Sequence, residues 1–372
     1  MKKNLICYLK NYHICPALFE MKKFYTLIFI ILLFGFPIRL KSQDVHFSQI
    51  QESPLFISPA YTGFFNGYFR AIANYRMQWS AMGSPFKTMA LQTDGGFFKN
   101  KKRNAFLGGG LTVYNDAAGS ANYSILSIGI NVSGIVKLSK QSAFSLGVYG
   151  GPVSNNANYP KLIFSQQFDG EKFDETLPSG EYYSFRKFTY TDVGAGLAYE
   201  FSKKKISEER DYVTAVKLGV GAYHINAPKQ SFTTASDYRL PARFTFHVTG
   251  LFDISGTPLS IMPNILYQIQ SSAREFNLGT HALYRFKNGT KITGEKNESK
   301  IGLGLYYRNK DAFVAQLLFD MGPFAITLAY DYNVSNYKIA TKGTGGYEVS
   351  LRYNILADAL FAQKSEYKNT TK

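Results

Sequence analysis

Four histidines lie beyond the first 42 residues and are the strongest candidates for metal or acid–base chemistry: His46, His224, His247 and His281. None stands in an H-x-x-x-H or H-E-x-x-H spacing, which places two imidazoles on one helix face in zinc enzymes. The sequence also contains no G-x-S-x-G nucleophile motif and no P-loop. We therefore expect no catalytic residue, no metal site, no cofactor and no enzymatic activity.

Paired glycines are the second pattern that could indicate a binding site. They occur at 194/196, 219/221 and 302/304, inside segments that alternate between apolar and polar residues. A dinucleotide-binding loop needs its glycines between a strand and a helix, whereas a spacing of two follows the period of a single strand. We interpret these glycines as small residues on the inner face of strands.

The net charge of +16 is large enough to suggest a nucleic-acid partner. About +10 of this excess remains beyond residue 42, and much of it sits in two clusters, KNKKR at 99–103 and KKK at 203–205. Short clusters of this kind are typical of solvated turns. Because a leader directs the chain out of the cytoplasm, we predict no nucleic-acid partner.

The leader is predicted at residues 21–42 and has the pattern of a secretory signal peptide. Two lysines precede an apolar run at 24–36, and Ser42 provides a small residue for cleavage before Gln43. The apolar run is too short to span a bilayer comfortably. Since the pattern begins at a methionine, we expect residues 1–20 to be a misassigned start.

The secreted part of the chain has a composition that favours an all-β fold. Aromatic residues make up 16 % of the sequence, glycines are frequent, and no long stretch follows a period of 3.6. Both cysteines, Cys7 and Cys15, precede the leader. We therefore predict no structural disulfide, no thiolate metal site and no lipid anchor in the secreted chain.

The secreted part repeats one pattern, about ten residues of alternating polarity followed by a turn, which is typical of a transmembrane antiparallel β-barrel. At 188–201, for example, Leu197 and Phe201 lie on one face, and Asp192 and Glu200 lie on the other. The apolar faces often end in Tyr or Phe, as expected for rings at the level of the lipid headgroups. We predict a barrel over 69–356 with about fourteen strands, at 69–79, 86–98, 105–115, 123–138, 141–154, 188–201, 212–225, 239–253, 258–270, 274–287, 299–309, 312–320, 322–333 and 345–356.

The lengths of the connections predict the orientation of this barrel. Short turns of bacterial barrels face the periplasm and long loops face the outside. The longest connections, 155–187 and 226–238, follow odd-numbered strands, so we predict that both termini are periplasmic. The connection 155–187 is expected either to fold inward as a plug or to bind a partner outside. A polar C-terminal tail follows at 357–372.

Charged residues of both signs are predicted to face the lumen. They more often pair with one another or with an inserted segment than form a selective path for ions. The residues are Asp192, Glu200, Lys217, Glu275, Arg285, Lys300, Arg308, Asp331, Glu348 and Arg352.

Residues 43–68 are predicted to form an irregular N-terminal segment. Its middle, SPLFISPAYTG at 53–63, cannot be a regular strand because Pro54 and Pro59 have no N–H to donate. A loop so rich in apolar residues must rest on a surface. We predict that it packs into the periplasmic mouth or the lumen as a plug or anchor, with docking to a periplasmic partner as the alternative.

The same region resembles a known family. QDVHFSQ at 43–49, SPLFISPAYTG at 53–63, NYRMQW at 74–79 and GSPFKT at 83–88 are similar to motifs of the PorP/SprF family of Bacteroidota outer-membrane proteins. The likeness continues to the final strand. The family-signature residues, which are our candidates for interaction, are Phe47, Pro54, Phe56, Pro59, Ala60, Tyr61, Gly63, Tyr75, Arg76, Gln78 and Trp79.

This resemblance implies an outer-membrane component of the type IX secretion and gliding machinery. It implies three kinds of partner: a large secreted cargo protein, such as an adhesin, recognised through its C-terminal sorting domain; other type IX secretion components; and outer-membrane lipid. The barrel pattern alone also fits a general porin or small-solute channel, and this alternative stays open at the level of the sequence.

Overall fold

A computed structural model describes residues 44–355 except for 84, 100–103, 120–122, 157–163, 175, 181–186, 206–211, 231–237, 288–297 and 337. The chain divides into two units, Met1–Ser42 and Gln43–Lys372, and the described residues all belong to the second. The predicted start, leader and tail lie outside the described residues.

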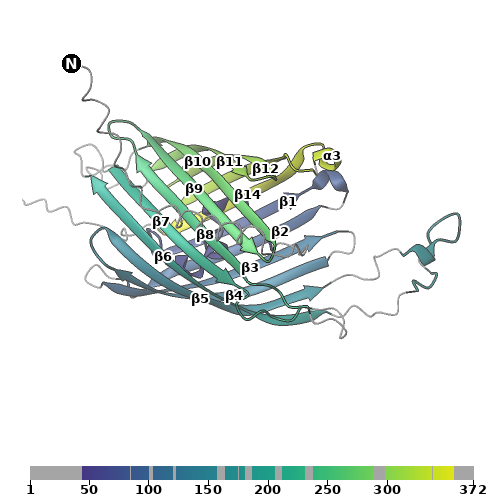
Figure 1. Cartoon of the computed structure of the whole chain (residues 1–372). Helices are drawn as coiled ribbons and strands as arrows, with labels where there is room; N and C mark the ends of the chain where they lie inside the picture. Colours follow the sequence, from purple (N-terminus) through teal and green to yellow (C-terminus); the bar gives the residue numbers. More distant parts are fainter. Residues whose placement is uncertain are drawn as a thin grey trace, which may run out of the picture. The chain divides into compact units, whose positions relative to one another are not determined.

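Within the described part, fourteen antiparallel strands close into one barrel, in which β1 is hydrogen-bonded to β14 (Figure 1). The predicted all-β barrel and its strand number are confirmed. The strands are β1 (Phe69–Gln78), β2 (Phe86–Phe97), β3 (Ala105–Ala118), β4 (Tyr123–Lys137), β5 (Ser142–Asn156), β6 (Phe188–Lys205), β7 (Tyr212–Tyr223), β8 (Arg243–Asp253), β9 (Leu259–Gln270), β10 (Ala273–Lys287), β11 (Ser299–Arg308), β12 (Ala312–Met321), β13 (Phe324–Asn333) and β14 (Thr344–Ile355).

The predicted strand limits differ from the observed ones mainly at the mouths of the barrel. β8 begins at Arg243, later than predicted, because Pro241 just before it has no N–H for a ladder hydrogen bond. β6 runs on to Lys205, which pairs with Tyr212 at the start of β7. Ladder pairing thus continues beyond the region in which the sequence alternates in polarity.

The barrel is apolar outside and polar inside. On β10, Phe276, Leu278 and Phe286 are exposed on the outer face, while Glu275 and Asn277 are buried in the interior. Along the other strands, exposed apolar residues likewise alternate with buried residues, which are mostly but not all polar. Because water would not stabilise such an outer face, the barrel fits a nonpolar surrounding.

The helices are short: η1 (Ile50–Glu52), α2 (Pro54–Ile57), η2 (Pro59–Tyr61), η3 (Ser80–Met82), η5 (Ser165–Gln167) and α3 (Lys338–Thr341). None of the helices in the described residues is long and apolar enough to cross a membrane.

The interior of the barrel holds residues 44–67, here called the lumenal segment. It contains η1, α2 and η2, and proline occupies the first position of the latter two helices, where an N–H would have no intrahelical partner. Its apolar residues form a core with inward residues of the strands, namely Ile50, Leu55, Ile57, Ala60, Tyr61 and Phe64 with Phe106, Ile135, Ala143, Ala198, Leu266, Tyr306, Val314 and Ala329. Among the locations predicted for this segment, namely the periplasmic mouth, the lumen and a periplasmic partner, the structure has the lumen.

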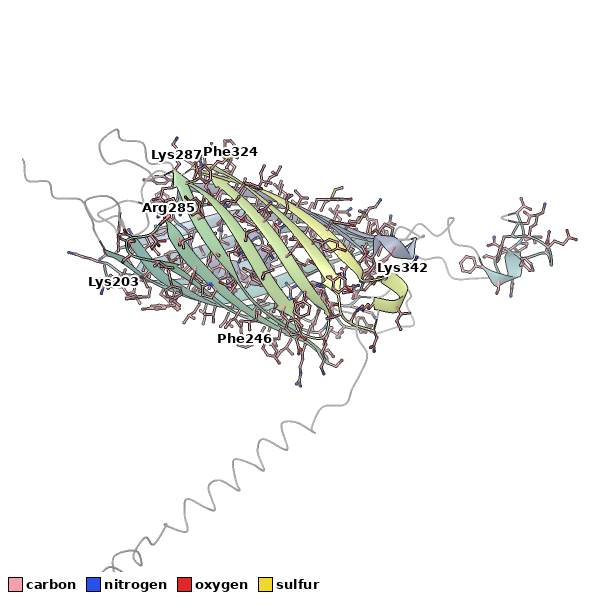
Figure 2. The ribbon with its side chains drawn as sticks, turned by 90° about the horizontal axis from the view of Figure 1, so that it is seen from above. Lys203, Phe246, Arg285, Lys287, Phe324 and Lys342 are labelled. Atoms are coloured by element: carbon pink, nitrogen blue, oxygen red, sulfur yellow. The ribbon has the colours of Figure 1, made fainter. Side chains whose placement is uncertain are left out.

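The lumenal segment runs from one mouth of the barrel to the other. The connections that follow odd-numbered strands lie at one mouth, which we call the odd mouth, and we call the opposite mouth the even mouth. Figure 2 shows Lys342 at the odd mouth, and Lys203 and Lys287 at the even mouth. At the odd mouth, the Asp44 amide donates to Oε1 of Gln270, the last residue of β9, at 3.0 Å.

At the even mouth, the amide of Tyr68 donates to the carbonyl of Ile355, the last residue of β14, at 2.9 Å. We predicted that both ends of the secreted chain lie at one mouth, whereas Asp44 and Ile355 lie at opposite mouths. The sequence did not reveal this arrangement because an irregular segment has no period from which its path can be read.

Inward glycines provide the space for this segment. A Cβ atom on Gly147 would lie 2.4 Å from the carbonyl oxygen of Pro59, and one on Gly221 would lie 2.2 Å from the carbonyl oxygen of Ile57. A Cβ atom on Gly196 would meet Ser58 Oγ at 2.2 Å. Two of the paired glycine motifs, at 194/196 and 219/221, therefore let the lumenal segment approach the barrel wall.

Gly147→Ala is expected to lower the free energy of unfolding by about 1–3 kcal/mol, because the new methyl group overlaps the backbone at Pro59. Gly134→Ala is the matched control, since nothing lies within 4 Å of its added Cβ, and it should be neutral or slightly stabilising. Urea unfolding in detergent, followed by the fluorescence of the single tryptophan Trp79, measures both. Equal stability of the two variants would contradict the close approach.

Candidate functional site

An ionic cluster anchors the lumenal segment near the odd mouth. The Ser48 hydroxyl donates to Asp331 Oδ2 at 2.7 Å and accepts from Arg76 at 2.6 Å and Arg308 at 2.9 Å. The amide of Ser48 donates to Glu348 Oε2 at 2.7 Å. We call these five residues the Ser48 cluster, and all of them are buried.

In the Ser48 cluster two guanidinium groups face the carboxyl groups of Asp331 and Glu348, and Arg308 also pairs with Asp311. Arg76 Nη2 and Arg308 Nη2 lie 3.0 and 2.9 Å from Asp331 Oδ2, and Arg76 Nη1 lies 3.2 Å from Glu348 Oε2. A buried charge without its partner is strongly destabilising, so each member depends on the others. The cluster joins the segment to β1, β11, β13 and β14 at once.

The next residues of the segment bridge the seam where the barrel closes. The Gln49 side chain donates to the carbonyls of Thr327 and Glu348 at 3.1 and 3.0 Å, and it accepts from the Ser350 hydroxyl of β14. Glu52 pairs with Arg352 of β14 at 2.6 Å. Its carbonyl accepts from Asn74 of β1 at 3.1 Å, so one turn of chain contacts both strands of the seam.

Tyr61 is fixed by a buried chain of hydrogen bonds. Asn264 Nδ2 donates to Thr249 at 3.1 Å, which leaves Asn264 Oδ1 to accept from His247 Nε2 at 2.7 Å. His247 Nδ1 is then the acceptor for the Tyr61 hydroxyl, also at 2.7 Å. The imidazole is therefore a structural bridge between the segment and β8 and β9.

Charged side chains of the strands also hold the end of the segment near the even mouth. Gly63, whose φ of +65° suits glycine, donates its amide to Asp94 Oδ2 at 2.8 Å. Arg70 binds the same carboxylate through Nε and Nη2, both at 2.9 Å. Lys217 and Lys99 donate to segment carbonyls, at 2.8 Å to Phe64 and at 2.6 Å to Gly67.

Asp44 is held at the odd mouth by a histidine and an arginine. His224 contacts Asp44 through Nε2 and Asp192 through Nδ1, the latter at 2.8 Å, and Arg243 Nε lies 3.6 Å from Asp44 Oδ2. Burial lowers the pKa of His224, but the two carboxylates outweigh it and raise the pKa to about 9. Burial raises the pKa of Asp44, yet His224 and Arg243 hold it well below its usual value.

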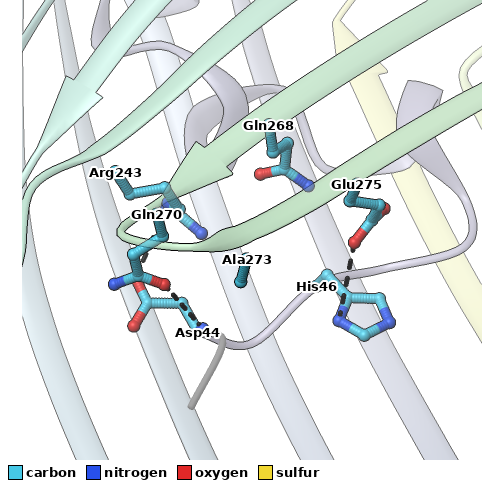
Figure 3. A pocket seen from close by; sticks show the side chains of 7 residues that line it. All are labelled: Asp44, His46, Arg243, Gln268, Gln270, Ala273 and Glu275. Atoms are coloured by element: carbon cyan, nitrogen blue, oxygen red, sulfur yellow. Dashed lines mark hydrogen bonds and ion pairs between the residues drawn. The ribbon is translucent and has the colours of Figure 1, made fainter. Parts of the chain in front are cut away.

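A cavity opens beside Asp44 at this mouth (Figure 3). His46 Nδ1 lies 3.9 Å from Glu275 Oε2 across it. Its lining consists of Asp44, His46, Arg243, Gln268, Gln270, Ala273 and Glu275. In the described residues, no group of three or more His, Cys, Asp or Glu side chains is placed to hold a metal ion.

The structure brings most of the family-signature residues together inside the barrel. Phe47, Pro54, Phe56, Pro59, Ala60, Tyr61 and Gly63 belong to the lumenal segment, and Arg76 reaches them from β1. Phe47 stacks on Phe56 with ring centroids 5.5 Å apart.

Three signature residues lie elsewhere. Tyr75 is exposed on the outer face of β1, because its neighbour Arg76 faces the interior and adjacent residues of a strand face opposite sides. Gln78 ends β1 at the odd mouth, and Trp79 follows it with a φ of +56° and its ring edge-on to Phe86 at 5.2 Å.

The sequence predictions found only part of what holds the segment. Asp331, Arg308 and Glu348 were predicted as lumen-facing charges that pair with one another or with an inserted segment, but they were not assigned to residues 44–67. His247 was considered only for metal or acid–base chemistry, and Asp94 was not singled out. The sequence does contain a signal for the first three residues. β11, β13 and β14 each carry a charged inward residue near the same mouth, so the inward charges are concentrated there. Charges that are buried together in this way need polar partners inside the lumen.

Comparison with families of known proteins now identifies the chain. The family described as "Type IX secretion system membrane protein PorP/SprF" matches residues 39–353. The chain belongs to the PorP/SprF family. Its barrel fold and this membership place the protein in the bacterial outer membrane, as predicted, and the PorP/SprF resemblance found in the sequence is confirmed.

Several solved structures are similar to the chain, with little sequence identity. They include the "TodX deltaS2S3 mutant monoaromatic hydrocarbon channel" (TM-score 0.43, 9 % identity, 82 % of this chain and 94 % of that one). The "CymD monoaromatic hydrocarbon channel" (0.40, 9 %, 81 % and 92 %) and BamA from Haemophilus ducreyi lacking POTRA domains 1–3 (0.39, 9 %, 78 % and 70 %) are also similar. The chain matches no curated protein sequence.

Arg76→Met should destabilise this PorP/SprF barrel by about 3–5 kcal/mol, because Asp331 and Glu348 would each lose a buried partner. Arg274→Met, at an exposed position of β10, is the control and should change the free energy of unfolding by less than about 0.5 kcal/mol. Urea unfolding in detergent gives both values. A loss below about 1 kcal/mol for Arg76→Met would contradict the role of the Ser48 cluster.

Stability should also fall as pH rises through about 9, because His224 then loses the charge that pairs with Asp44 and Asp192. A folded-state pKa above the unfolded value of 6.5 gives stability that is complete below pH 6.5 and is lost toward pH 9. The loss in the urea midpoint between pH 7 and 10 should be smaller in His224→Gln. The same pH dependence in both proteins would contradict this ion pairing.

Proposed function

We propose that this PorP/SprF protein is a non-enzymatic docking barrel of the type IX secretion machinery. It binds a large secreted protein, such as an adhesin, through the C-terminal sorting domain of that protein, and helps to export it or attach it to the cell surface. Its other partners are components of the same secretion system and the outer-membrane lipid around the barrel.

The filled interior of the barrel is the observation that supports this function best. The lumenal segment runs from the hydrogen bond between Asp44 and Gln270 to the hydrogen bond between Gly67 and Lys99, and its residues are buried along most of this path. A passive porin needs a continuous water-filled path. In this barrel such a path would require the Ser48 cluster and the contact between Tyr61 and His247 to break.

The filled interior also bears on where a cargo protein docks. Since the chain occupies its own lumen, the surfaces left for a folded domain are the mouths and their connections. The part of the long connection around η5 is mostly exposed, with Phe168 and Phe173 in mutual contact at 5.2 Å between ring centroids. Solvent-exposed aromatic pairs on a loop are suited to protein contacts.

Affinity capture tests the proposal directly. A tagged form isolated from outer membranes without harsh denaturants should bring down a secreted protein with a C-terminal sorting domain, together with type IX components. An untagged strain is the control. Recovery of the barrel alone, under conditions that preserve other type IX complexes, would overturn the proposed function.

Conductance in planar bilayers separates this function from the porin alternative. The purified barrel should give no stable open pore, because the lumenal segment is bonded to the wall at both mouths and at the Ser48 cluster between them. A variant that lacks residues 44–67 serves as the positive control if it still shows heat-modifiable migration. A stable pore in the unaltered protein would favour the porin.

A further inference from the structure

We infer that the amino-terminal end of the lumenal segment, Asp44 to Phe47, faces the outside of the cell. The secreted chain would thus begin at the cell surface, while its last strand ends on the periplasmic side. This inference concerns topology and does not rest on the proposed binding of cargo.

The first step of the argument is the position of Asp44. Its three side-chain and backbone partners are Gln270 at the end of β9, Arg243 at the start of β8 and His224 directly after β7. All three strand ends border connections that follow odd-numbered strands. Asp44 therefore lies at the odd mouth, and Figure 3 shows it beside Gln270 and Arg243.

The second step is the direction of the chain from there. Ser58 Oγ donates to the carbonyl of Val220 at 2.8 Å, Ser133 of β4 donates to the carbonyl of Thr62 at 2.6 Å, and Lys217 donates to that of Phe64. On β7, which begins at the even mouth, the contact of Phe64 at Lys217 lies nearer that mouth than the contact of Ser58 at Val220. The chain then enters β1 at Phe69, which pairs with Ile355.

The third step is the side of the membrane that each mouth faces. The connections at the odd mouth include 157–187, 224–242 and 334–343, whereas the longest at the even mouth is 288–298. In bacterial outer-membrane barrels the long loops are extracellular and the short turns are periplasmic. The odd mouth is therefore the outer one.

Single cysteines test the topology, because the chain has no cysteine beyond Cys15. Val45→Cys reports on the amino-terminal end, Lys342→Cys on the odd mouth and Lys287→Cys on the even mouth. Intact cells are treated with a small membrane-impermeant maleimide, and the labelling is compared with that after permeabilisation of the outer membrane. Heat-modifiable migration checks that each variant is folded.

In intact cells, Val45→Cys and Lys342→Cys should be labelled to within about twofold of their permeabilised levels, and Lys287→Cys only after permeabilisation. Because Val45 is half-buried, a peptide epitope inserted before Asp44 provides a second readout, and an antibody should bind it on intact cells. Accessibility of the Val45 position or the epitope only after permeabilisation would overturn the inference. If Lys342→Cys were also labelled only after permeabilisation, the assignment of the odd mouth to the outside would be wrong. If Lys342→Cys were labelled in intact cells, the path assigned to the lumenal segment would be wrong.

Discussion

Ser48 lies between two arginines and two carboxylates in the interior of the barrel, and much of the structure follows from this arrangement. Buried charges are tolerated only when each has partners. The strands supply the four charges, and the lumenal segment supplies the hydroxyl and the amides that complete their hydrogen bonds. The barrel thus encloses its own N-terminal residues as a core, where a porin would hold water.

The wall and the segment are matched to each other along the whole lumen. Where the backbone of the segment comes closest to the wall, the strands carry glycine, as at Gly147 and Gly221. Where the segment presents backbone carbonyls, as at Phe64 and Thr62, the strands carry donors such as Lys217 and Ser133. The outer face needs only apolar side chains, whose exact identity matters little. The contacts that require particular residues therefore lie in the lumen and at the mouths of the barrel.

The strands could be predicted because a barrel wall has a strict period of two, which also placed Arg308, Asp331 and Glu348 on the inner face. Their partners could not be predicted, because Ser48 and Glu348 are separated by 300 positions and meet only through the closed sheet. The signature motif grouped Tyr75 with Arg76, although the same period requires them to face opposite sides. The path of the segment was beyond sequence reasoning, since it depends on contacts such as that between Asp44 and Gln270.

Hydrogen–deuterium exchange of the barrel in detergent is the most direct measurement of whether the lumenal segment is part of the core. Peptides that cover residues 48–63 should exchange as slowly as peptides from β13 and β14, because amides such as those of Ser48, Leu55 and Gly63 are buried and hydrogen-bonded. Peptides from the connection around η5 provide a rapidly exchanging reference in the same sample. Exchange of residues 48–63 at the rate of that reference would show that the segment is not an integral part of the folded barrel.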